Sequence, residues 1–120
     1  MRSRSLAIIG LAVFLAGLTL ASAEEKYGVQ VYEGAKYDAD TSQFLITALK
    51  VDGACYRTSA TPAQVNEFYK KQPGITVVDT NPKGGMFSKG KTNITVQAPW
   101  KNMKTGQEMK DTLISIVNTK

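Results

Sequence analysis

The sequence predicts an α+β fold with a mainly antiparallel sheet of four or five strands and one or two helices packed on one face. Two observations predict it. Several segments rich in β-branched residues alternate apolar and polar side chains, most clearly Thr92–Ala98. Among them lies one segment, Pro62–Gln72, with the start and stop signals of a helix. Because short turns join the alternating segments, we expect antiparallel pairing.

The first 23 residues have the three parts of a secretory signal peptide. Two arginines precede an apolar run, and an Ala-Ser-Ala sequence that ends at Ala23 supplies a cleavage site. The run of about 15 residues is shorter than the roughly 20 that a membrane-spanning helix needs. We expect cleavage after Ala23, with an uncleaved anchor as the alternative. Residues 24–120 then form a single α+β domain that is secreted or periplasmic, with no transmembrane segment.

The amino-terminal half of this domain is expected to hold a short leading strand or extended arm, two helices and a strand between them. Val29 and Val31 alternate with polar residues, and the next strand is expected over Gly53–Ser59. Asp40 is a candidate N-cap for a helix over Thr41–Lys50, whose apolar residues recur on one face. Asp52 and Gly53 are expected to end that helix.

The clearest local signal is the start of the helix over Pro62–Gln72. Thr61 is followed by proline and, three residues on, by Gln64, which is the pattern of a capping box. The apolar face of this helix consists of Val65, Phe68 and Tyr69. Pro73 and Gly74 then end the helix.

The carboxy-terminal half is expected to be mostly strand. The expected elements are a strand at Ile75–Asp79, a hairpin of Met86–Ser88 and Thr92–Ala98, a loop at Pro99–Met103, a helical turn at Thr105–Glu108 and a strand at 112–118. The last segment also fits a helical stripe, so helix is its alternative. The expected core contains Tyr56, Val65, Phe68, Val77, Ile94, Val96 and Ile114.

Residues 85–92 read GMFSKGKT, which matches the phosphate-binding pattern G-x-x-x-x-G-K-T/S. In a phosphate-binding loop, a helix begins directly after the Lys and Thr, and its amide groups help to hold the phosphates. Here the following residues, TNITVQAP, have the period of a strand and meet Pro99. The sequence therefore predicts a hairpin turn and no nucleotide binding.

Side chains suited to catalysis are sparse. The sequence has no histidine and one cysteine, Cys55, which shares a strand face with Arg57. A cysteine within a strand is usually a small core residue, and the alternative is a reactive thiol. We expect no catalytic residue, no metal and no cofactor. A non-enzymatic protein is favoured over a small envelope enzyme or thiol protein centred on Cys55 and Arg57.

Positive charge is concentrated in the last third of the chain. Residues 83–110 carry six lysines against one acidic residue, whereas residues 24–82 carry more acidic than basic residues. The candidate binding surface consists of Phe87, Lys89, Lys91, Trp100, Lys101 and Lys104. Aromatic and ammonium groups together suit an anionic envelope component or an acidic protein face. The alternative is a solvated basic surface with both aromatics in the core; export disfavours nucleic acid as a partner.

Two segments, VYEGAKYD and ACYRTSATPAQVNEFYKKQ, resemble small exported bacterial proteins and lipoproteins of unknown function. These carry a Tyr-Pro-Gly-Ala segment, a strand that ends in Thr and a helix of the form V-x-x-F-Y. The matching positions are Tyr32, Gly34, Ala35, Lys36, Arg57, Thr58, Val65, Phe68 and Tyr69, with Glu33 in place of the proline. The resemblance implies a helix packed on an antiparallel sheet, and no reaction or ligand. We therefore expect an exported binding or interaction module of the bacterial envelope.

Overall fold

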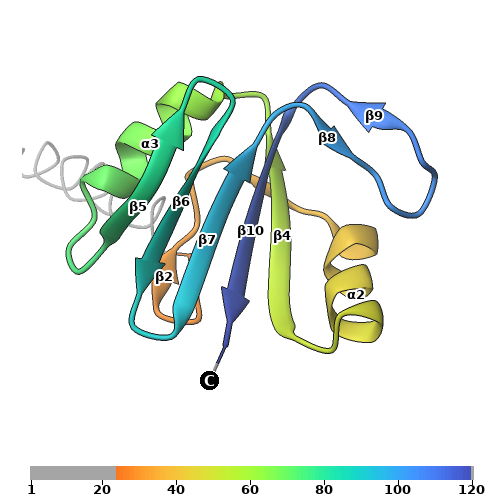
Figure 1. Cartoon of the computed structure of the whole chain (residues 1–120), viewed down its shortest axis with the longest axis horizontal. Coiled ribbons are helices and arrows are strands. Elements are labelled where there is room, and N and C mark those ends of the chain that lie inside the picture. The colour runs from red at the N-terminus through yellow and green to blue at the C-terminus, as the bar shows by residue number, and fades with distance from the viewer. Residues whose placement is uncertain (1–23, 120) are drawn as a thin grey trace, which may run out of the picture.

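The computed structural model describes residues 24–119, so the expected signal peptide at residues 1–23 lies outside the described residues. The largest sheet has six antiparallel strands (Figure 1). In spatial order they are β3 (Lys36–Tyr37), β4 (Asp52–Thr58), β10 (Thr112–Asn118), β7 (Thr92–Gln97), β6 (Gly84–Lys89) and β5 (Thr76–Asn81). Two small hairpins pair β1 (Glu25–Lys26) with β2 (Val29–Gln30) and β8 (Trp100–Lys101) with β9 (Glu108–Met109). The described helices are α2 (Ala39–Ala48) and α3 (Pro62–Lys70).

The last long strand, β10, lies in the middle of the sheet between β4 and β7. Ile114 is paired with Tyr56 on one side and with Val96 on the other, and all three side chains are buried. Because side chains in one row of a sheet share a face, this row forms the centre of the main core. The strand prediction for residues 112–118 is therefore confirmed over the helical alternative.

The helix α3 covers the core face of the sheet over β5, β6 and β7. Its capping box is formed as predicted, because Thr61 accepts from the Gln64 amide and the Gln64 side chain accepts from the Thr61 amide. Val65 and Tyr69 are completely buried against the sheet. The buried Asn66 amide nitrogen also donates to the Gly84 carbonyl at 3.0 Å, which ties the helix to β6.

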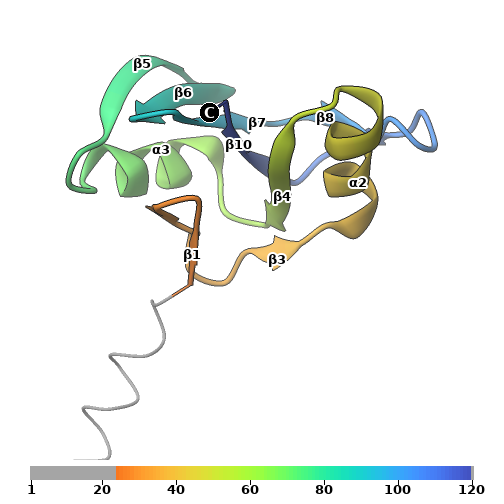
Figure 2. The ribbon, with the colours of Figure 1, turned by 90° about the horizontal axis from the view of Figure 1, so that it is seen from below.

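The amino-terminal arm closes the same core. Figure 2 shows β1 on the side of the sheet that carries α3. Val29 and Val31 are buried in the main core, and the Tyr69 hydroxyl donates to the Gln30 carbonyl at 2.8 Å. Tyr32 packs edge-on against Phe68 with ring centroids 5.2 Å apart. The arm thus supplies apolar cover that α3 alone does not give.

The helix α2 lies beside β4 and packs on a second, smaller cluster (Figure 1). Its Leu45 contacts the cluster formed by Cys55, Trp100 and Leu113. Cys55 and Leu113 alternate along their strands with residues of the main core, so they lie on the opposite face of the sheet. The expectation that both helices share one face is corrected: only α3 covers the main core.

Other details of the sequence-based prediction are also corrected. The sheet has six strands because the short β3 adds to one edge. The helix predicted over Thr41–Lys50 begins earlier, because Asp38 and not Asp40 accepts from the Thr41 amide as N-cap. Asp52 and Gly53 open β4 and do not end the helix.

Two further expectations are wrong, one because of tertiary context and one because of a local turn. Val77, expected in the core, is 44% exposed because β5 is the outermost strand of the sheet. The helical turn predicted at Thr105–Glu108 is absent, since the Asn102 side chain accepts from the Lys104 and Thr105 amides and organises a turn before β9. Among the described residues, no helix is long and apolar enough to cross a membrane.

Candidate functional site

The lysines predicted to form one binding surface lie at opposite ends of the sheet (Figure 1). Lys89 and Lys91 flank the turn between β6 and β7, whereas Trp100, Lys101 and Lys104 follow the far end of β7. A strand of six residues is about 20 Å long. The two groups therefore cannot contact one compact ligand together.

Both aromatic members of the predicted surface are buried. Phe87 is 1% exposed and packs in the main core, with its ring centroid 5.7 Å from that of Tyr69. Trp100 is 3% exposed and belongs to the second cluster. The exposed part of the predicted site therefore consists of lysines.

At the hairpin end, the strand register brings lysines from distant segments to one edge of the sheet. Asp52, Asn118 and Thr92 lie in one row across β4, β10 and β7. Asp52 and Thr92 are about 10 Å apart by strand spacing; Lys91 directly precedes Thr92, and Lys50 precedes Asp52 by two residues, in the connection from α2. Lys89 is the residue of β6 paired with Thr92. The three lysines Lys50, Lys89 and Lys91 are called the basic edge below.

The basic edge is held in place by bonds to both termini of the described chain. The Lys91 carbonyl accepts from the Thr119 amide at 2.8 Å and from its hydroxyl at 2.9 Å. On the other side, Lys89 Nζ donates to the Gly28 carbonyl at 2.9 Å, and the Thr92 hydroxyl donates to the Tyr27 carbonyl at 2.9 Å. The turn is thus a fixed part of the fold, and its lysine side chains are exposed.

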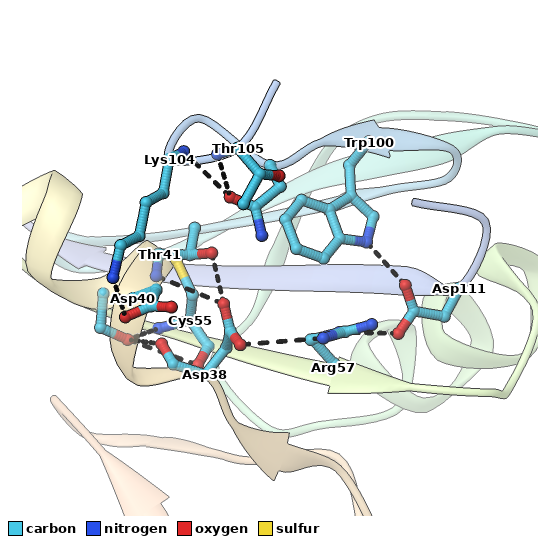
Figure 3. A network of polar contacts seen from close by, with 11 residues as sticks. Asp38, Asp40, Thr41, Cys55, Arg57, Trp100, Lys104, Thr105 and Asp111 are labelled. Carbon is cyan, nitrogen blue, oxygen red and sulfur yellow. Dashed lines mark hydrogen bonds and ion pairs between the residues drawn. The ribbon is translucent and has the colours of Figure 1, made fainter. Parts of the chain in front are cut away.

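At the opposite end of the sheet, Arg57 lies between two carboxylates (Figure 3). Its Nε is 2.8 Å from Asp111 Oδ2, and its Nη1 is 3.9 Å from Asp38 Oδ1. The guanidinium carbon lies 5.3 Å from the Trp100 ring centroid, and Trp100 Nε1 donates to Asp111 Oδ1 at 2.9 Å. Arg57 is therefore neutralised within the fold and leaves little positive charge for an external anion.

This group borders an open hollow of about 420 Å³. The hollow is lined by Gly34, Lys36, Tyr37, Asp38, Arg57, Thr58, Ser59 and Asp111. Lys104, near the same end, is also compensated, since its Nζ lies 3.3 Å from Asp40 Oδ1. Arg57 and Lys104 are thus paired with carboxylates, whereas Lys36 and Lys101 at this end form no ion pair within the described residues.

Cys55 is a buried thiol and not an exposed nucleophile. It is completely buried, and its sulfur lies 3.4 Å from the Ser115 hydroxyl. Burial is the main cause that raises the pKa of the thiol above 9.0; the Ser115 hydrogen bond lowers it and the Asp38 charge raises it. Arg57 shares the strand face, as predicted, but is bound to carboxylates. The thiol therefore stays protonated at neutral pH, and no activating group compensates for its burial.

Two residues of the Arg57 group, Asp38 and Asp111, were not identified from the sequence. Arg57 is paired with Leu113, so Asp111, two residues earlier, lies on the same face. Only the pairing of β4 with β10 shows this, because the two residues are far apart in the chain. Asp38 could have been found as a helix N-cap from its position before α2, but Asp40 is an equally good N-cap candidate in the sequence.

The remaining motif, residues 85–92, forms a hairpin turn. Lys91 and Thr92 lead into β7, so the helix that a phosphate-binding loop requires does not follow, and the hairpin prediction is confirmed. Within residues 24–119, no three Cys, Asp or Glu side chains are grouped as metal ligands would be.

Comparisons of the chain with protein-family models, with curated proteins and with solved structures gave no match. The fold and the site therefore define a class by geometry alone. It is a small α+β domain whose six-stranded antiparallel sheet carries lysines at the tip of a central hairpin.

Proposed function

We propose that this protein is an exported, non-enzymatic binding module of the bacterial envelope, and that the basic edge contacts an anionic partner. One observation carries the proposal: Lys89 and Lys91 flank the β6–β7 turn, and Lys50 precedes β4 at the same end of the sheet. Within the described residues, none of these lysines forms an ion pair with a carboxylate. Their charge is therefore available to a partner.

The spacing of the lysines favours an extended anionic surface over a small anion. Lys50 and Lys91 precede β4 and β7, two strands that lie about two strand spacings, or 10 Å, apart. That distance is close to the screening length at moderate ionic strength, so their fields add at a surface that spans both. A small anion would instead need donors that converge on one point. Phospholipid headgroups are an envelope component that presents charge in this way.

Binding to vesicles with and without an anionic phospholipid tests the proposal. We expect the protein to sediment with anionic vesicles, to remain free with neutral ones and to dissociate as salt is added. Each lysine near an anionic surface contributes about 1 kcal/mol. Reversing two charges with Lys89→Glu and Lys91→Glu should therefore weaken binding at least about thirtyfold.

A matched control reverses the same number of charges at the other end of the sheet. The variant Lys101→Glu, Lys104→Glu should retain most of the binding, because it has the same net charge but an intact basic edge. Since Lys89 also bonds to Gly28, a second variant with Gln at positions 89 and 91 separates charge from local structure. Equal losses in both Glu variants, or no binding by the wild type, would exclude the basic edge as the contact.

A further inference from the structure

The strand β5 is an open edge of the large sheet. It is the last strand in the sheet order and pairs only with β6 among the described strands. One row of its backbone amide and carbonyl groups therefore has no strand partner, and it extends over the six residues Thr76–Asn81. An edge of this kind is a template for one further strand.

The opposite edge of the sheet is closed to the same kind of pairing. There β3 has only two residues, and α2 uses the neighbouring backbone of β4. The Cys55 amide donates to the Ser42 hydroxyl at 2.8 Å, and its carbonyl accepts from the Asp38 amide at 2.8 Å. The edge at β5 thus differs from β3 in being both long and uncovered.

Apolar side chains are exposed along the open edge. Val77 is 44% exposed and Val78 is 58% exposed, and a bulge at Val78 shifts the pairing with β6. On β6, Met86 is paired with Asp79 and is 49% exposed. Natural sheets usually protect edges with short strands, charges or bulges. Here a bulge and the charge of Asp79 are present, but both valines remain exposed to solvent.

A hollow adjoins this edge on the sheet. It has a volume of about 300 Å³ and is lined by Asp79, Asn81, Lys83, Gly84, Gly85, Met86, Thr95, Val96, Gln97, Ala98 and Pro99. Among the lining residues, the side chains of Met86 and Asp79 are exposed to solvent. Lys83 stands at the turn after β5 and forms no ion pair with Asp79. The carboxylate of Asp79, which forms no ion pair within the described residues, favours a cationic side chain on an added strand.

We propose that β5 binds an extended peptide segment of a partner protein as a seventh strand of the sheet. The segment has apolar residues against Val77 and Val78 and a Lys or Arg beside Asp79. Backbone hydrogen bonds supply affinity in this mode, and the side-chain contacts supply specificity. Asp79 favours such a segment over a second copy of the same strand, since self-pairing brings two carboxylates to one short edge. Stable dimers bury about 1,200 Å² or more of surface. Pairing of two six-residue edges alone buries less than this area.

The test uses three fluorescent peptides of alternating Thr and Val, identical except for Lys, Glu or Thr at the central position. We expect the Lys peptide to bind at least about fivefold more tightly than the Glu peptide. Amide shifts in the NMR spectrum should be largest at Thr76–Asn81. Methylation of alternate peptide nitrogens should abolish binding, because it removes the donors on one peptide edge.

Charge reversal at the protein makes the test specific. Asp79→Lys should invert the preference, so that the Glu peptide binds more tightly than the Lys peptide. Glu33→Lys, at an exposed acid outside this edge, should leave the preference unchanged, as should the Glu variant of Lys89 and Lys91. Shifts located elsewhere, an unchanged preference in Asp79→Lys, or self-association of the free protein through β5 would each overturn the proposal.

Discussion

A β-carbon added at Gly84 would lie 2.1 Å from the carbonyl oxygen of Val96, which is backbone of the neighbouring strand and has no room to move. We predict that Gly84→Ala lowers the free energy of unfolding by about 3 kcal/mol, measured by urea denaturation. Gly90→Ala is the control, because open space surrounds Gly90 and only its φ of 61° opposes a side chain. That change should cost about 1 kcal/mol. A smaller loss in Gly84→Ala than in Gly90→Ala would contradict the close contact.

The Asp111 carboxylate serves two partners at once, Trp100 Nε1 and Arg57 Nε. Asp111→Ala leaves the buried indole without an acceptor, so we predict a loss of about 1–2 kcal/mol in the free energy of unfolding. Asp111→Asn keeps an acceptor and should lose less. Trp100 is the only tryptophan, so its fluorescence reports both unfolding and a change in its surroundings. Equal stability of the Ala variant and the wild type would show that this group contributes nothing measurable.

At the scale of single elements, the features that depend on neighbouring residues were predicted correctly from the sequence. The capping box at Thr61 and Gln64 fixed the start of α3, and the alternation along Thr92–Gln97 identified β7. Both signals depend on residues within four positions of one another, so they do not require knowledge of how distant segments pack. The same is true of the hairpin around Gly90, which placed Lys89 and Lys91 correctly at its turn.

Elements whose role depends on distant partners were predicted less well. The exposure of Val77 follows from the position of β5 at the end of the sheet order, which a strand pattern does not contain. The placement of α2 on the second cluster depends on Leu45 meeting Cys55 and Leu113. For the candidate site, the lysines of the turn were identified, but the burial of Phe87 and Trp100 was decided by tertiary packing.

Across the whole molecule, the two proposed contact surfaces are separate. The basic edge lies where the strands end, at the β6–β7 turn. The open edge for peptide binding runs along β5, the outermost strand of the sheet. Lys89 is paired with Thr92 and not with β5, so charge reversal there leaves the peptide-binding edge intact. The two proposed contacts therefore do not compete for the same residues. The two experiments above test these contacts independently.

The folded domain should lose stability as the solution becomes alkaline. Burial raises the pKa of the Cys55 thiol above 9.0, and burial followed by the nearby Glu24 raises the pKa of Tyr56 from 10.0 to about 12. A raised folded-state pKa means that the unfolded chain releases its proton first, so stability is full below the unfolded pKa and falls as pH rises above it. Above about pH 9 the thiol ionises more readily in the unfolded chain than in the folded one, so stability should fall as the pH rises toward the raised folded-state pKa of Cys55. Urea denaturation at several pH values measures this slope, and Cys55→Ala, whatever its absolute stability, should flatten it in that interval. An identical slope in both proteins would show that the thiol ionises as readily in the folded chain as in the unfolded one.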